Sequence, residues 1–200
     1  YDDVLTPHAA TEDWQRTVLD TIYALPASYG PGALVDSGSA GLNGGYRVRA
    51  GLAADLRAMA DAARRAGSPI GVTSAYRSYD SQIATFNHWV AVSGYDAALR
   101  RSARPGHSEH QLGTTIDARS AGGGSPWLVS DWARTAAGSW MRDNAWRYGF
   151  VMSYPRGASA ITCYDYEPWH YRYVGRSTAA AVRASGLTLR EWLWRTDAGG

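Results

Sequence analysis

The sequence predicts a single α+β domain, and three observations lead to that prediction. Its 200 residues fall within the usual size range of one domain. Helical and strand-like stretches are mixed, without the regular alternation of strand and helix that produces a doubly wound sheet. Four short stretches are rich in β-branched and aromatic residues and are predicted as strands: 70–74, 114–118, 150–154 and a segment that begins near His170.

Three stretches in the first half of the chain have the apolar periodicity of helices. The stretch 11–25 has apolar residues four positions apart, with Thr11 as a candidate N-cap. The stretch 52–66 has a continuous apolar face and ends before a glycine. The stretch 78–92 is also predicted to be helical, with an apolar stripe formed by Ile83, Phe86 and Val90.

The other segments are predicted as loops and shorter helices. The Gly- and Ser-rich stretch 30–45 is predicted to be a long loop, and 102–113 is loop-like. The segment 127–146 is predicted to be helical in two pieces, with a break near Gly138. Two short helices are expected to close the chain: 178–185 and 189–194.

The composition excludes several classes of protein. A formal net charge of +2 gives no polycationic surface, so we expect no nucleic-acid partner. No apolar run approaches the roughly 18 to 20 residues that span a bilayer, so we expect no transmembrane segment in this chain. No signal peptide is visible. Cys163 is the single cysteine, so no internal disulfide can form and any metal must be held by histidine and carboxylate groups.

The stretch 164–175 reads YDYEPWHYRYVG and places a carboxylate, Glu167, three residues before an imidazole, His170. Pro168 disfavours a helical conformation for the residue before it, which argues against two groups one helical turn apart. The aromatic residues after the proline favour a strand. On that strand His170 shares a face with Arg172, while the aromatic residues take the other face.

The stretch 108–117, SEHQLGTTID, adds His110 and Asp117. Together with His170 they make two imidazoles and a carboxylate. Three nitrogen and oxygen ligands with an open fourth position are the pattern of a catalytic zinc site, and these groups suit zinc or a similar divalent metal. Glu167 need not bind the metal, and could instead take a proton from water that the metal has acidified.

The chain has other histidines and a glutamate that could compete as metal ligands. His107 lies close to His110, and spacing alone does not choose between the two; we favour His110. His8 and His88 stand alone, and His88 lies on the polar side of its predicted helix, where a solvated side chain is expected. Glu109 is expected to point outward.

Arg77 stands just before the predicted helix 78–92. An arginine at a helix N-terminus could bind a carboxylate or an oxyanion through two hydrogen bonds. The alternative is an ordinary exposed arginine, since most arginines are exposed. Its polar neighbours favour a site over that alternative: Tyr76, Ser78, Tyr79 and Gln82.

Together these stretches resemble the zinc D-alanyl-D-alanine peptidases of the VanY type, in the group that includes lysostaphin-like enzymes and the hedgehog signalling domain. The matches follow the expected order: SAYRSYDSQ (74–82), RPGHSEHQLGTTID (104–117), NAWRYGF (144–150) and YEPWHYRYVG (166–175). The resemblance implies a small central antiparallel sheet with helices packed around it. The matches cover the chain from about residue 70 to 175, which we expect to be the catalytic core of a single domain at 1–200. We expect an N-terminal helical and loop part before it, at 1–69, and C-terminal helices after it, at 176–200.

The resemblance further implies a role for each matching residue. One catalytic Zn²⁺ would be held by His110, Asp117 and His170. Glu167 would act as general base and later as acid, and Arg77 would stabilise the oxyanion of the attacked carbonyl. Ser108 and Gln82 match positions that contact the terminal D-residue of the substrate.

Four residues depart from the pattern of these peptidases. Ser153 stands where relatives often have arginine, and Cys163 stands where a glycine is common. Thr114 and Thr115 replace small apolar residues. None of the four is a predicted ligand or base, so the departures bear on substrate preference and leave the predicted reaction unchanged.

The implied activity is that of a zinc-dependent D,D-carboxypeptidase that removes the C-terminal D-alanine from peptidoglycan stem pentapeptides, with the free D-Ala-D-Ala dipeptide as an additional candidate substrate. Three alternatives remain: an L,D-carboxypeptidase acting on tetrapeptides, a peptidoglycan endopeptidase, and a non-catalytic binding domain that keeps the metal. The intact Glu167 weighs against the last. We expect a stem peptide or muropeptide as the partner, a monomer, and an extracytoplasmic location in the cell envelope or in secreted form.

Overall fold

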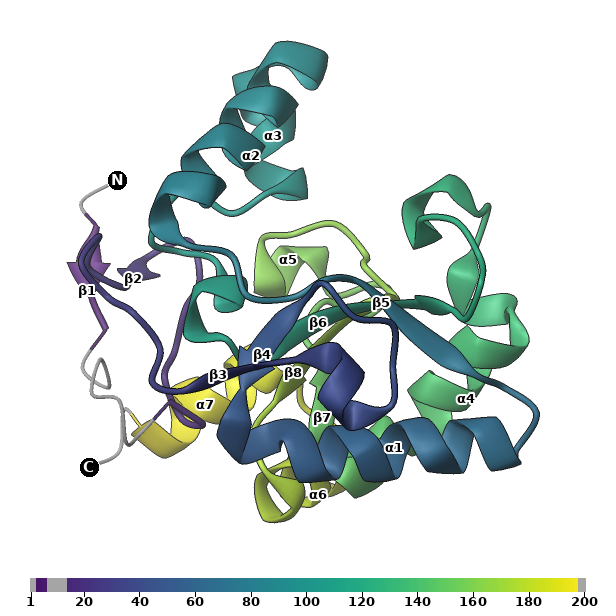
Figure 1. Ribbon diagram of the computed structural model, residues 1–200. Coiled ribbons are helices and arrows are strands. Elements are labelled where there is room, and N and C mark those ends of the chain that lie inside the picture. The colour runs from purple at the N-terminus through teal and green to yellow at the C-terminus, as the bar shows by residue number, and fades with distance from the viewer. Residues whose placement is uncertain (1–2, 7–13, 198–200) are drawn as a thin grey trace.

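The computed structural model describes residues 3–6 and 14–197, and a four-stranded antiparallel sheet lies at the centre of the molecule (Figure 1). The strands follow the order β5-β6-β8-β7, and each is antiparallel to its neighbour. Their bounds are Ile70–Ser74 for β5, Thr115–Ser120 for β6, His170–Tyr173 for β8 and Phe150–Met152 for β7. The α+β fold with a small central antiparallel sheet is therefore confirmed.

The register of this sheet brings polar residues to one level. Asp117 of β6 is opposed by Ser74 of β5 on one side and by His170 of β8 on the other. An irregularity between Val72 and Ser74 shifts the pairing just before that point. Three strands thus present polar side chains where the sheet meets the loops that follow β5 and precede β8.

The main core lies between the sheet and two helices, α1 (Ala53–Arg65) and α4 (Ala136–Asn144). The prediction of a helix at 52–66 is confirmed by α1, whose apolar face packs against the sheet. Fully burying one such aliphatic side chain contributes roughly 1.5–3 kcal/mol. The largest aliphatic and aromatic members of this core are Leu52, Leu56, Met59, Ile116, Trp132, Met141, Phe150 and Tyr171.

Two helices project from the side of the sheet opposite α1, at the top of Figure 1. They are α2 (Tyr79–Ser93) and α3 (Tyr95–Arg101), and they pack against each other. The prediction of a helix at 78–92 is confirmed. Its predicted apolar stripe is only partly right: Phe86 is buried, but Ile83 is 40% exposed because α2 stands away from the body of the molecule. The short α3 was not predicted.

A second core holds the C-terminal helices against the N-terminal segment. Its helices are α6 (Arg176–Ser185) and α7 (Leu189–Asp197), which confirm the two predicted closing helices, and the short α5 (Ser159–Thr162) lies beside α7. The buried residues of this core are Val18, Val174, Ala179, Val182, Leu189 and Leu193. Among the described residues, no helix combines the length and apolarity that a membrane span requires.

The predicted helix at 11–25 is wrong over its described part, while Thr11 lies outside the described residues. Residues 14–25 form turns and the strand β2 (Tyr23–Ala24), which pairs in parallel with β1 (Val4–Leu5). Asp20 explains the difference, since its Oδ1 accepts hydrogen bonds from the backbone N–H groups of Ile22 and Tyr23 at 2.7 and 2.8 Å. An aspartate that bonds its own backbone in this way competes with helix formation.

Two further predictions need correction. The predicted loop 30–45 contains the strand β3 (Leu34–Asp36), which pairs with β4 (Arg47–Arg49). Gly138 lies inside α4 and does not break it; a side chain there would meet the carbonyl oxygen of Trp132, because the helix packs closely on the preceding turn. The short 3-10 helices are η1 (Ser37–Ala40), η2 (Ala50–Leu52), η3 (Glu109–Leu112), η4 (Pro126–Leu128), η5 (Trp132–Arg134) and η6 (Ala145–Tyr148).

Candidate metal centre

Three side chains from separate segments meet beside the sheet: His110 from η3, Asp117 from β6 and His170 from the start of β8. One nitrogen or oxygen atom from each lies within 4.8 Å of the other two. Asp117 Oδ2 is 3.4 Å from His110 Nε2, and Asp117 Oδ1 is 3.4 Å from His170 Nδ1. All three residues are buried. The structure thus brings together the residues predicted from sequence as metal ligands.

The hydrogen bonds behind this cluster suit a divalent cation. His110 Nδ1 lies 2.7 Å from the carbonyl oxygen of Ala75, to which only a protonated nitrogen can donate, so Nε2 is left with its lone pair. His170 Nε2 lies 2.9 Å from Glu109, which leaves Nδ1 facing the cluster. Among the described residues, Asp117 Oδ1 is buried and has no hydrogen-bond partner. Two imidazoles and a carboxylate that converge in this way fit zinc.

The electrostatics of the cluster point the same way. Burial alone would raise the pKa of Asp117, but His110 and His170 hold that pKa well below its usual range. Burial lowers the pKa of His110. Burial would also lower the pKa of His170, but the nearby carboxylates of Asp117, Glu109 and Glu167 raise it well above the ordinary value. The carboxylates of Asp117, Glu109 and Glu167 thus surround the His170 ring and favour a positive charge at the cluster.

Glu167 lies beside this cluster in the turn that precedes β8. Its Oε2 is 3.4 Å from His170 Nδ1, and its backbone N–H donates to the carbonyl of Tyr154. The turn predicted from Pro168 is present, because the N–H of His170 bonds back to the carbonyl of Glu167. Burial raises the pKa of the Glu167 carboxyl. A carboxylate thus faces the cleft next to the three convergent ligand atoms.

Arg77 lies on the other side of the cluster, and its guanidinium contacts three side chains. Its Nε donates to Gln82, one terminal nitrogen donates to Ser74 Oγ at 3.2 Å, and the other to Ser108 Oγ at 3.4 Å. Burial lowers the pKa of this arginine, while the Asp117 and Glu167 carboxylates raise it. Ser108 lines the cleft with Arg77. Gln82 is fully buried behind the guanidinium, where its amide also bonds Ser102 and the Ala103 carbonyl.

The prediction for Glu109 is wrong, because its side chain points inward. It is 4% exposed and its carboxylate contacts three groups: Ser153 Oγ at 2.6 Å, His170 Nε2 at 2.9 Å and Arg172 at 3.1 Å. Burial alone would raise the pKa of Glu109, but Arg172, His170 and Ser153 lower it to about 2. A signal was present in the sequence: Arg172 shares a strand face with His170, and a buried arginine needs an acidic partner.

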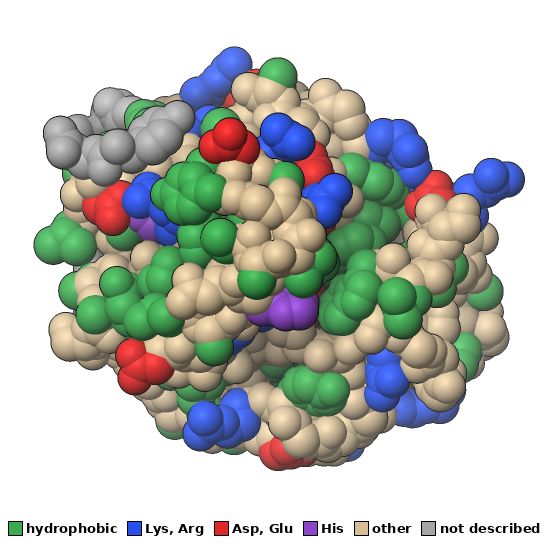
Figure 2. Space-filling model, turned by 90° about the horizontal axis from the view of Figure 1, so that it is seen from above, with side chains coloured by type: hydrophobic (Ala, Val, Ile, Leu, Met, Phe, Trp, Pro, Cys, Tyr) green, Lys and Arg blue, Asp and Glu red, His purple; other side chains and the backbone are tan. Residues whose placement is uncertain are grey.

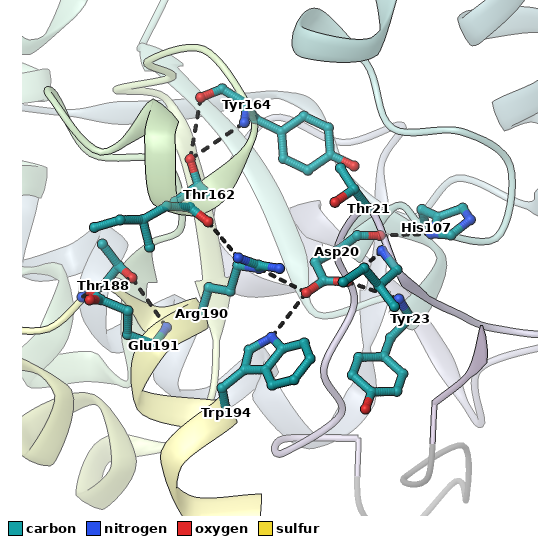
Figure 3. Close-up of polar contacts among 12 residues, drawn as sticks. Asp20, Thr21, Tyr23, His107, Thr162, Tyr164, Thr188, Arg190, Glu191 and Trp194 are labelled. Carbon is teal, nitrogen blue, oxygen red and sulfur yellow. Dashed lines mark hydrogen bonds and ion pairs between the residues drawn. The ribbon is translucent and has the colours of Figure 1, made fainter. Parts of the chain in front are cut away.

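His107 is turned away from the cluster. Its Nδ1 lies 2.7 Å from the carbonyl oxygen of Asp20, and its Nε2 lies 3.1 Å from Asp3 Oδ1. Figure 3 shows this contact next to a buried network in which Arg190 and Trp194 of α7 both point at the Asp20 carboxylate, at 2.7 and 3.0 Å. His107 thus helps to fasten the loop before η3 to the N-terminal segment. His88 is exposed, as predicted, and His8 lies outside the described residues.

A cleft of about 570 Å³ opens above the cluster, on the face from which α2 and α3 project. Figure 2 looks onto this face and shows a hollow bordered by hydrophobic side chains, with a histidine at its edge. The floor of the cleft includes the cluster together with Glu167, Arg77 and Ser108. Its walls are largely aromatic: Trp89, Trp127, Tyr154, Tyr164, Tyr166 and Trp169. The cleft is therefore much larger than the cluster and can hold an extended ligand.

The structure shows the surroundings of the four residues that depart from the peptidase pattern. Ser153 donates to Glu109, as described above. Cys163 is exposed and has a φ of 66°, in the left-handed region that a glycine adopts without strain. Thr114 and Thr115 are fully buried, and neither Oγ1 has a hydrogen-bond partner among the described residues. None of these four residues is part of the cluster.

Three buried nitrogen and oxygen donors beside a free carboxylate, at the floor of a cleft, are the arrangement of a catalytic metal site in a hydrolase. Comparison with known proteins identifies the family of the chain. The chain belongs to the VanY family, which is described as D-alanyl-D-alanine carboxypeptidase and whose family model matches residues 45–176.

Two curated relatives show how far this similarity extends. The chain is 40% identical over 175 residues to YodJ of Bacillus subtilis, a match that covers 85% of this chain and 63% of the relative. It is 31% identical over 191 residues to a D-alanyl-D-alanine carboxypeptidase of Enterococcus faecalis, covering 91% of this chain and 66% of the relative. The chain thus spans slightly less than two thirds of the length of these relatives.

Solved structures share the fold. The LD-carboxypeptidase LdcB has a TM-score of 0.76 and 36% identity, over 87% of this chain and 83% of that one. The vancomycin resistance D,D-pentapeptidase VanY, solved in complex with Zn(II), has a TM-score of 0.76 and 31% identity, over 90% of this chain and 99% of that one.

Proposed function

We propose that this protein is a zinc-dependent D,D-carboxypeptidase that removes the C-terminal D-alanine from peptidoglycan stem pentapeptides. The observation that carries the proposal is the convergence of His110, Asp117 and His170 on the floor of the cleft, next to Glu167. Membership of the carboxypeptidase family supports the reaction, and the zinc complex of the similar VanY pentapeptidase supports the metal. The catalytic core of this proposal is 70–175.

In this proposal zinc is held by His110 Nε2, Asp117 and His170 Nδ1, the atoms that their other hydrogen bonds leave free. When bound there, zinc supplies a Lewis acid that polarises the scissile carbonyl and acidifies water. Glu167 takes a proton from the attacking water at its carboxylate and passes it to the amine of the leaving D-alanine. Its place beside the cluster and at the cleft surface allows both transfers.

Arg77 supplies the second part of the proposed site. Its guanidinium borders the cleft, where it stabilises the negative charge that develops on the carbonyl oxygen of the substrate. Ser108, which also lines the cleft, contacts the terminal D-residue. Gln82 acts indirectly, because its buried side chain holds the guanidinium in place and does not line the cleft.

The size of the cleft supports a stem peptide over a free dipeptide as the main substrate. A dipeptide would occupy only the floor near Arg77 and Glu167, while the aromatic walls extend to Trp127 at the rim. Cleavage of the free D-Ala-D-Ala dipeptide would use the same floor. Because the substrate is a cell-wall peptide, we further propose that the protein acts outside the cytoplasm.

A second candidate is an L,D-carboxypeptidase that acts on tetrapeptides. The similarity to the LD-carboxypeptidase LdcB, at 36% identity, favours it. Both activities would use the same three ligands and the same base. They differ in the chirality of the residue before the scissile bond, and hence in the shape of the cleft wall near the cluster.

One experiment separates these candidates. The protein is incubated with purified muropeptides that carry either pentapeptide or tetrapeptide stems, and the products are weighed by mass spectrometry, with a zinc chelator as control. The proposal predicts loss of one alanine from the pentapeptide alone, and no loss with chelator. Trimming of the tetrapeptide alone would establish the L,D activity instead. Binding without any cleavage would indicate a non-catalytic domain.

A further inference from the structure

We propose that Glu109 is a positioning residue for the metal site: its carboxylate accepts the Nε2–H of His170 and thereby keeps Nδ1 of that imidazole available as a ligand. Glu109 does not line the cleft, so the role is indirect. The inference rests on the proposed function in one respect, namely that a metal is the group bound by His170.

The contacts of the His170 ring show why such a residue is needed. Its Nδ1 lies 3.4 Å from Asp117 Oδ1 and 3.4 Å from Glu167 Oε2. An imidazole that binds a metal is neutral and carries one proton, so the nitrogen that faces the metal must be the one without the proton. Two carboxylates in front of Nδ1 would attract the proton there and remove the lone pair that a metal requires. Glu109, at 2.9 Å from Nε2, is the carboxylate that draws the proton to the opposite side of the ring.

Two further side chains donate hydrogen bonds to the Glu109 carboxylate and hold it in place. Ser153 Oγ donates to the same oxygen, Oε2, at 2.6 Å, and Arg172 donates to Oε1 at 3.1 Å. Arg172 is fully buried, and its second terminal nitrogen donates to the carbonyl oxygens of Thr17 at 2.6 Å and Trp14 at 3.2 Å. A hydrogen-bonded path thus runs from the N-terminal segment through Arg172 and Glu109 to the ring of His170.

The two candidate imidazole ligands are oriented in different ways. His110 is oriented by a backbone carbonyl, that of Ala75, at 2.7 Å. His170 is oriented by a side chain from the residue next to His110. The single turn of η3 therefore supplies one ligand to the front of the cluster and the orienting group for another ligand behind it. Side chains that orient ligands in this way typically contribute about 10- to 100-fold to metal affinity.

The test is the zinc affinity of purified protein, measured by competition with a chromophoric chelator. Glu109→Gln keeps the shape but removes the charge, and it leaves Arg172 buried without a counter-charge. The double variant Glu109→Gln/Arg172→Met removes both charges. Glu109→Asp keeps the charge but withdraws the carboxylate from His170. We expect about 10- to 100-fold weaker zinc binding in each folded variant. The fall in kcat should be larger than any change in KM.

Asp20→Asn is the matched control. Asp20 is also a buried carboxylate paired with an arginine, at 2.7 Å from Arg190, but it contacts no member of the cluster. Its replacement should lower thermal stability while zinc affinity stays within about threefold, because the hydrogen bonds and ion pair of the Asp20 carboxylate go to Ile22, Tyr23, Arg190 and Trp194, and none goes to Glu109 or to the cluster. Unchanged zinc affinity in folded Glu109→Asp or in the folded double variant overturns the inference. The proposed function fails separately, if wild-type protein binds zinc but leaves muropeptides intact.

Discussion

Asp117 of β6 and His170 of β8 are directly opposed across an antiparallel pair of strands, with 3.4 Å between Asp117 Oδ1 and His170 Nδ1. Side chains at opposed positions leave the same face of a sheet, so backbone pairing alone brings these two groups together. His110 is added by η3, whose position is fixed when the N–H of Arg77 bonds the carbonyl of His110 at 3.2 Å. The backbone therefore builds the cluster, and a cation adds to an arrangement that already exists.

Replacing Glu167 tests its proposed role as base. Glu167→Gln should retain zinc but lower kcat on pentapeptide by about 10²- to 10⁴-fold, the usual contribution of a general acid or base. Zinc content measured by atomic absorption, together with kcat, checks both parts. Turnover near the wild-type rate would show that another group moves the proton.

The paired variants His110→Ala and His107→Ala test the choice of ligand. His110→Ala should lose zinc, because it removes one of the three convergent atoms. His107→Ala should keep zinc but unfold at a lower temperature, because it removes a buried hydrogen bond to Asp20, a loss of roughly 1–3 kcal/mol. Zinc analysis and thermal melts of both proteins decide the matter, and the opposite pattern would reverse the assignment.

Trp127 tests whether the substrate extends along the cleft. It is 46% exposed and lies edge-on to Trp169, with ring centroids 6.1 Å apart. Trp127→Ala should raise KM for the pentapeptide muropeptide by about 3- to 10-fold, as expected from the loss of one aromatic contact. Hydrolysis of free D-Ala-D-Ala should be almost unaffected. Equal effects on both substrates would indicate that the rim makes no contact with the longer one.

Asp20 should give the protein part of its acid sensitivity. Burial alone would raise the pKa of Asp20, but hydrogen bonds from the backbone of Tyr23 and Ile22 and from Arg190 lower it below the ordinary value. A lowered native pKa means that the stabilisation is present above the ordinary pKa and is lost as the pH falls through the native one. Urea unfolding of Asp20→Asn should therefore show lower stability at pH 7 and a weaker loss of stability below about pH 4 than wild-type protein.

Much of the site could be predicted because its residues lie in short segments whose local structure is strongly determined. Pro168 fixes the turn before β8, and strand composition fixes the face on which His170 lies. The glycine at 113, with a φ of 72°, ends η3 and returns the chain to β6. Each of these features depends on residues that are neighbours in sequence, so the turn, the strand and the end of η3 could be predicted from the pattern of residues.

The parts that were missed depend on partners far away in the sequence. Glu109 points inward because Arg172, 63 residues later, lies opposite it in the interior. The segment 14–25 is not helical because Asp20 bonds Arg190 and Trp194 of α7, 170 and 174 residues later, as well as its own backbone. Apolar periodicity cannot reveal such contacts, since they depend on which polar side chains become buried together.

The backbone at Cys163 has a practical consequence. Within the described residues it is the one non-glycine position with positive φ, and the thiol is exposed. A side chain in this conformation carries a steric penalty of roughly 1–2 kcal/mol, which glycine avoids. Cys163→Gly should thus produce a protein without thiols that melts no lower than the parent. Under oxidising storage only the parent should form covalent dimers on a non-reducing gel, and zinc binding should be the same in both.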